Sequence, residues 1–77
     1  MEVLKADNIM CASASFGECL KFYRENKGLT QEYFAELIDV SDRMVRKWEA
    51  DVNYPRMSNV KRIVDVLGVS LESILLW

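Results

Sequence analysis

The stretch LTQEYFAELIDVSDRMVRKWE, from Leu29 to Glu49, contains two helix starts in close succession. Thr30 and Ser41 can each serve as a helix N-cap, because their hydroxyl groups accept a hydrogen bond from a backbone N–H of the first helical turn. At both starts an apolar residue precedes the cap and a second one follows it one helical turn later, the pattern called a hydrophobic staple. These features predict one helix over residues 31–38 and another over residues 42–50.

Only Asp39, Val40 and Ser41 separate these two predicted helices. A link this short does not easily let two helices run antiparallel, and it favours the steep crossing of a helix-turn-helix unit. In such a unit the second helix protrudes from the domain. The major groove of B-DNA, which is about 12 Å wide, can accept a helix of this kind.

A capping box opens a further predicted helix upstream. The Ser15 hydroxyl can accept from the amide of Glu18, while the Glu18 carboxylate can accept from the amide of Ser15. Apolar residues then recur with the spacing of one helix face, at Phe16, Cys19, Leu20 and Tyr23. We expect this helix to end near Gly28, because glycine readily adopts the left-handed conformation that ends a helix.

Another helix is expected downstream of Pro55, which cannot lie in the middle of a helix. Its apolar face recurs at helical spacing and consists of Val60, Ile63, Val64 and Leu67. Gly68 ends it, and Ser58 or Asn59 would be a better N-cap than Arg56.

A third staple surrounds Ser70 and predicts a last helix over residues 71–76. No stretch alternates with a period of two residues, so we expect no sheet. The fold class is therefore all-α, a compact domain of five helices.

The chain has 77 residues, which is enough for one domain. We expect residues 15–77 to form it, with residues 1–14 as an N-terminal segment of unknown role. No signal peptide and no membrane-spanning apolar run is evident, which favours a cytoplasmic protein without a membrane span. The apolar residues 74–77 complete the core in part. The remainder could form a dimer contact or fold back on its own domain, and the candidates for sharing that contact are Val3, Leu4, Ile9 and Met10.

The sequence offers little for catalysis or metal binding. It has two cysteines and no histidine, whereas a structural zinc site uses four Cys or His ligands. No nucleophile–base pair and no glycine-rich phosphate loop stands out. We therefore expect no enzymatic activity, no cofactor and no metal, and we expect Cys11 and Cys19 to be buried, reduced thiols.

The helix predicted over residues 42–50 gathers charge on one side. Val45 and Trp48 are three residues apart and face inward, so the opposite side carries Asp42, Arg43, Arg46 and Lys47. Arginine can donate two hydrogen bonds to guanine O6 and N7, and lysine can donate to the same atoms with less geometric discrimination. Asp42 could accept from a cytosine amino group or could pair with Arg46 one turn away. A solvated basic stripe with local ion pairs is the alternative interpretation of this face.

The run from Leu20 to Trp77 resembles the helix-turn-helix domains of the Cro and lambda-repressor type, the Xre-like family. The resemblance rests on several separate motifs, which are the Leu20/Arg24 pair, GLTQ at residues 28–31, Phe34-Ala35, Val40-Ser41, Val45, Trp48-Glu49, Pro55 and LGVSLESIL at residues 67–75. It implies a lambda-repressor-like fold. It also implies a sequence-specific transcriptional regulator, most simply a repressor, that binds double-stranded DNA as a homodimer with the helix at 42–50 in the major groove.

The resemblance also implies roles for individual residues. Gln31 would donate to a DNA phosphate, unless it is only a good helix former, and Ser41 would cap the next helix and touch phosphate. The positions that read bases or nearby phosphates are Asp42, Arg43, Arg46 and Lys47. The loop that follows would contact the backbone through Asn53, Tyr54 and Arg56, although Tyr54 could simply cover Trp48. Arg24 and Glu49 match a family ion pair that orients the recognition helix.

Three aspartates depart from what DNA binding favours. Asp39 and Asp51 stand where the family prefers glycine, and together with Asp42 they lie near the expected phosphate path. The net charge of −2 adds to this repulsion. We therefore predict weak, strongly salt-dependent DNA binding, or binding that depends on dimerisation. The alternative function is a protein–protein interaction module, antitoxin-like or regulator-binding, built on the same fold.

Overall fold

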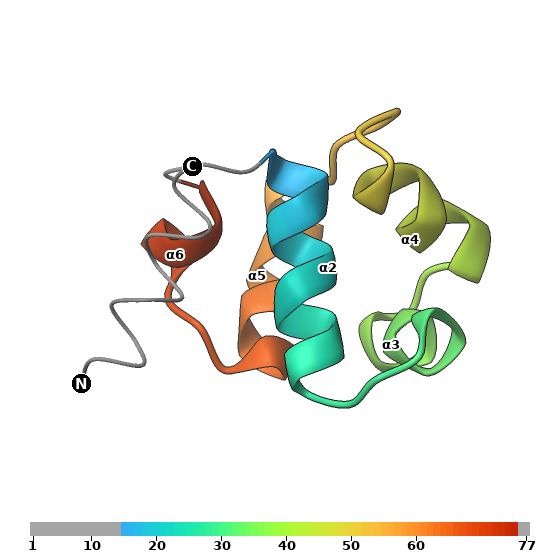
Figure 1. The fold of residues 1–77 in the computed structure, drawn as a ribbon, viewed down its shortest axis with the longest axis horizontal. Coiled ribbons are helices and arrows are strands. Elements are labelled where there is room, and N and C mark those ends of the chain that lie inside the picture. The colour runs from blue at the N-terminus through green and yellow to red at the C-terminus, as the bar shows by residue number, and fades with distance from the viewer. Residues whose placement is uncertain (1–14, 76–77) are drawn as a thin grey trace.

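The computed structural model describes residues 15–75 of the chain, and these form an all-helical domain without strands (Figure 1). The helices, labelled as in the figure, are α2 (Phe16–Asn26), α3 (Gln31–Ile38), α4 (Asp42–Glu49), α5 (Met57–Leu67) and α6 (Leu71–Leu75). α3 and α4 lie at one end, α6 lies at the other, and α2 and α5 lie between them. The predicted fold class, an all-α domain of five helices, is confirmed for this part of the chain.

The predicted helix caps are present. The Ser15–Glu18 capping box forms in both directions, with bonds of 3.0 and 3.1 Å. Thr30 and Ser41 accept from the backbone at the starts of α3 and α4, and Ser70 does so ahead of α6. Side-chain capping therefore fixes where four of these helices begin, as the sequence indicated.

The start of α5 differs from the prediction. The helix begins at Met57 with Arg56 in the N-cap position, and no side chain caps its first turn. Ser58 and Asn59, the better caps by type, lie inside the helix instead. The chain here leaves Pro55 in an extended conformation suited to an N-cap, and packing of Val60 and Ile63 in the core offsets the missing cap.

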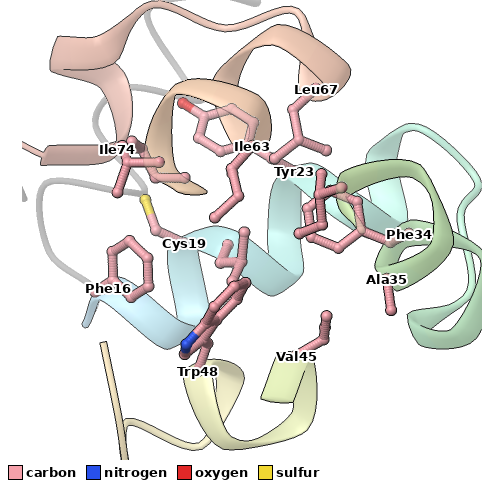
Figure 2. Packing of buried hydrophobic residues seen from close by; sticks show 13 residues of the cluster. Phe16, Cys19, Tyr23, Phe34, Ala35, Val45, Trp48, Ile63, Leu67 and Ile74 are labelled. Atoms are coloured by element: carbon pink, nitrogen blue, oxygen red, sulfur yellow. The ribbon is translucent and has the colours of Figure 1, made fainter. Parts of the chain in front are cut away.

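One core joins the helices, with Trp48 and Phe34 as its largest fully buried side chains (Figure 2). Val45, Trp48, Ile63 and Leu67, which the sequence placed on inward or apolar helix faces, are buried, and so are Phe34 and Ile38. Ala35, also buried, leaves room for the close contact of α3 with α4. The core thus holds α4 from its inner side while leaving its outer side open.

Gly17 brings the first turn of α2 against the last turn of α4. A Cβ atom at this position would lie 2.4 Å from the Glu49 carbonyl oxygen and 2.7 Å from the Trp48 carbonyl oxygen. These distances are far below van der Waals contact, so only glycine fits here without a backbone shift. The absent side chain sets how close α2 and α4 can come.

Cys19 corrects one expectation. Its side chain is buried, as predicted, but its sulfur is disulfide-bonded and not a reduced thiol. Burial and helical spacing are the same for a thiol and a disulfide, so the sequence pattern did not distinguish them. The expectations for residues 1–14 and for residues 76–77 lie outside the described residues. No helix in the described part is long and apolar enough to cross a membrane.

Candidate nucleic-acid interface

Asp39, Val40 and Ser41 alone link α3 to α4, as the sequence predicted. Asp39 caps the C-terminus of α3 in the left-handed conformation, with φ 62° and ψ 47°. Its N–H and that of Val40 donate back into the last turn of α3, and Ser41 at once caps α4. Aspartate accepts this conformation better than most residues other than glycine, which explains how the turn forms without one.

α4 presents its polar side to solvent. Val45 and Trp48 are buried against the core, while Arg43 and Arg46 are exposed. Asp42 and Lys47 are half-buried on the same outer side. The structure therefore brings together the four α4 residues that the sequence singled out, Asp42, Arg43, Arg46 and Lys47.

Met44, which the sequence reasoning did not single out, also reaches the surface of α4, with 37% of its area exposed. A methionine in an amphipathic helix is usually expected in the core, so the sequence pattern did not predict that Met44 is exposed. Its exposed thioether adds an apolar contact to an otherwise charged face.

A buried ion pair ties α4 to α2. Glu49 accepts from Arg24 through both carboxylate oxygens, at 2.6 Å from Nε and 3.1 Å from Nη2. Only 8% of the Arg24 side chain and 5% of the Glu49 side chain are exposed, and Arg24 also donates to the Leu29 carbonyl oxygen at 2.6 Å. Such a two-pronged, desolvated pair fixes geometry well, which matches the orienting role that the family resemblance implied.

Gln31 joins this network. Its side-chain nitrogen donates to Glu49 Oε1 at 3.0 Å, so the first residue of α3 is bonded to the last residue of α4. One of its N–H groups is thereby used inside the protein. Its expected contact with a DNA phosphate stays a prediction, and the second N–H group would have to make it.

Asp42 and Arg46 form an ion pair along α4, with 2.9 Å between Oδ2 and Nη1. The hydrogen bond from Arg46 is the largest cause that holds the pKa of the Asp42 carboxyl below its ordinary value of 3.8. Of the two roles open to Asp42, pairing with Arg46 is therefore present in the structure. Within the described residues Arg43 and Lys47 form no ion pair, which leaves their charges available to a ligand.

Asp51 has a structural partner that the sequence did not reveal. It is left-handed, with φ 59°, and its Oδ1 accepts from the backbone N–H of Gly17 at 2.9 Å. The carboxylate thus sits at the positive N-terminus of α2. A charge held in this way repels an approaching phosphate less than an unpaired one.

The loop after α4 is open to solvent. Asn53, Tyr54 and Arg56 are all exposed, and the Tyr54 ring meets Phe16 edge-on with 5.8 Å between centroids. These three residues line a groove of about 400 Å³ between the loop, α4 and the start of α5, together with Val40, Met44, Trp48, Pro55 and Asn59. Tyr54 contacts Phe16 and also borders the groove beside Trp48, and its expected contact with the DNA backbone stays a prediction.

The sequence model of the helix-turn-helix family matches residues 20–74, which is most of the chain and nearly all of the described helices. The chain belongs to the helix-turn-helix family. The two capped helices and the buried Arg24–Glu49 pair are features that the sequence linked to the Cro and lambda-repressor type of this family.

One relative of this helix-turn-helix chain is the HTH-type transcriptional activator BcrR of Enterococcus faecalis. The two sequences are 38% identical over 60 residues, which cover 78% of this chain. The chain spans 29% of the length of that relative. The similarity to this transcription regulator thus covers most of the helix-turn-helix chain and a minor part of the regulator.

Proposed function

We propose that the protein regulates transcription by binding double-stranded DNA with α4 in the major groove. The observation that carries this proposal is the outer face of α4, where Arg43 and Lys47 form no ion pair within the described residues. Arg43 is exposed and can reach base edges, while Lys47 is half-buried and closer to the domain. Arginine is the side chain best suited to guanine in the major groove.

The start of α5 supplies a second group of donors. Its first turn has no side-chain cap, and Arg56 and Asn59 at this helix start line the groove together with Asn53. A helix N-terminus with an adjacent arginine suits a phosphate. We assign contacts with the DNA sugar–phosphate backbone to Asn53, Tyr54 and Arg56. Gln31 and Ser41 are assigned to phosphates on the other side of the DNA major groove.

The acidic residues near this path oppose binding less than the net charge suggests. Asp42 is paired with Arg46 and Asp51 is held by the α2 N-terminus, so two of the three aspartates have local positive partners. Asp39 has no such partner among the described residues. Net repulsion remains, and we expect moderate affinity that falls steeply with salt.

We further propose that the protein binds as a homodimer in the cytoplasm and represses by occupying its operator. One domain covers only a half-site, and two recognition helices about 34 Å apart would match one turn of DNA. Repression is supported by the resemblance to Cro and lambda repressor. A promoter–reporter assay with the selected operator would decide the direction of regulation, and activation would contradict this part of the proposal.

Fluorescence anisotropy with a random-sequence duplex across a salt series tests DNA binding. We expect the wild-type chain to bind at low salt, with affinity falling steeply as salt rises. Arg43→Ala/Lys47→Ala removes two phosphate or base contacts, so it should weaken binding and make the salt dependence shallower by roughly one to two units of slope.

A matched control is Lys21→Ala/Lys61→Ala, which removes the same charge from exposed positions on α2 and α5. We expect it to change binding much less than the α4 variant does. Absence of binding at low salt from a folded sample would refute the proposal and favour the protein-interaction alternative. Equal weakening by both double variants would refute the assignment to α4.

A further inference from the structure

The Asp42–Arg46 pair places hydrogen-bond acceptors and donors side by side on the outer face of α4. Nη1 of Arg46 donates to Oδ2 of Asp42 at 2.9 Å, and 41% of the Asp42 side chain and 49% of the Arg46 side chain remain exposed. The guanidinium has further N–H groups outside this bond, and a carboxylate can accept about four hydrogen bonds. The pair can therefore bind a ligand without first separating.

A C·G base pair presents the complementary pattern in the major groove. Cytosine offers the N4 amino donor, and guanine offers the O6 and N7 acceptors next to it. In an A·T pair the amino donor is flanked by an acceptor on each side, so a guanidinium cannot reach two neighbouring acceptors. A carboxylate that faces thymine O4 or guanine O6 would be repelled.

We propose that Asp42 and Arg46 read one C·G base pair as a unit. The Asp42 carboxylate accepts from cytosine N4, and the Arg46 guanidinium donates to guanine O6 and N7. This inference rests on the proposed insertion of α4 into the major groove. It makes Asp42 a specificity-determining residue, although its charge opposes DNA binding in general.

Two physical effects support such a role. Arg46 is already held by Asp42, so it loses less side-chain freedom on binding than an unpaired arginine would. A carboxylate near DNA also disfavours every site that lacks a matching donor, which gives discrimination at the expense of overall affinity. Arg43 and Lys47 remain available for phosphates or for other bases.

The test begins with the whole chain and a randomised duplex library from which bound sequences are selected. Each base pair of the selected duplex is then changed in turn, and the affinities of wild type, Asp42→Ala and Arg46→Lys are measured at one salt concentration. At one C·G position we expect the change to T·A to weaken wild-type binding by roughly tenfold or more. Both variants should lose most of that discrimination, and Asp42→Ala should bind random duplexes more tightly than wild type.

Asp65→Ala is the matched control, since it removes one exposed carboxylate from α5. It should keep the wild-type preference at every position. Circular dichroism of each variant checks that the fold is intact.

The outcomes separate the two proposals. If the wild-type chain binds no duplex at low salt, the proposed function fails, and this inference fails with it. If it binds DNA but Asp42→Ala keeps the same preference at every position, only the reading by the pair is refuted. Binding without any sequence preference, or discrimination through Asp42 at a position other than C·G, would refute it equally.

Discussion

Asp39 and Asp51 adopt the same left-handed conformation, yet their carboxylates have different surroundings. Asp51 accepts from the Gly17 N–H, whereas no described residue bonds to the Asp39 side chain. Glycine relieves the strain that any side chain meets in this conformation. The two positions therefore respond differently to glycine.

We expect Asp39→Gly to raise the free energy of unfolding by about 0.5–1 kcal/mol. Asp51→Gly should give no gain or a small loss, because it also removes a hydrogen bond worth about 0.5–1.5 kcal/mol. Urea unfolding of both variants measures the difference. Equal stabilisation by the two substitutions would show that the Asp51–Gly17 bond contributes nothing.

The Asp42–Arg46 pair gives a prediction for pH. The pKa of Asp42 is lowered in the folded protein, so the pair stabilises the fold above about pH 3.8 and this contribution is lost as pH falls below that value. A carboxyl carbon NMR titration should place the Asp42 midpoint below 3.8. In Arg46→Ala the midpoint should return toward 3.8.

Arg43→Ala is the control for this titration, because it removes a cation of α4 that forms no ion pair among the described residues. It should leave the Asp42 midpoint nearer to the wild-type value than Arg46→Ala does. If the Asp42 titration midpoint is the same in Arg46→Ala as in wild type, the Asp42–Arg46 pair does not persist in solution.

From the residues alone, roles were predictable only where the interaction is local, and the distant Arg24–Glu49 pair was implied by the family resemblance. The Ser15–Glu18 box lies within one turn, so its residues alone indicate it. The Asp51–Gly17 bond joins residues 34 positions apart and exists only because α2 packs on α4. The spacing of Asp42 and Arg46 is compatible with an ion pair and also with contacts to bases. The sequence does not distinguish the two, because exposed side chains have several accessible conformations.

At the scale of elements, the contact of α2 with α4 depends on Gly17. A Cβ atom added to this residue would meet two backbone carbonyl groups, which cannot rotate away as a side chain can. We expect Gly17→Ala to lower the free energy of unfolding by about 1–3 kcal/mol, even though alanine is the better helix former. Urea unfolding measures this loss.

Lys21→Ala on the same helix is the control, since Lys21 is exposed and alanine favours helix there too. Its effect should stay within about 0.5 kcal/mol. An unchanged or increased stability of Gly17→Ala would contradict the close approach of α2 and α4.

Helix starts with a side-chain cap were predictable, and the one without it was not. Thr30, Ser41 and Ser70 each mark a helix that begins at the next residue. α5 begins after Arg56 because of Pro55 and the burial of its apolar face, neither of which fixes a start from sequence alone.

At the scale of the molecule, the two sides of α4 have different roles, since the inner side packs in the fold and the outer side is open to a ligand. Its inner side is held by Val45 and Trp48 in the core and by Glu49 in the buried pair with Arg24. Its outer side carries charges that contribute little to the fold. The net charge of −2 conceals this division, because it counts acids with local partners equally with the available cations.

The family and the five helices could be predicted because several independent motifs agreed on one fold. The disulfide at Cys19 could not, because a buried cysteine on an apolar helix face looks the same with or without one. The sequence predicted that the site lies on one face of α4. It did not predict the individual contacts, because these depend on the DNA that the face binds.

An NMR titration of the labelled chain with the selected duplex tests the central claim most directly. We predict that amide shifts change along the outer face of α4, at the start of α3 and from Asn53 to the first turn of α5. The amides of α6, at the opposite end of the domain, should change little. Changes centred on α6, or none along α4 while DNA is bound, would contradict the insertion of α4 into the major groove.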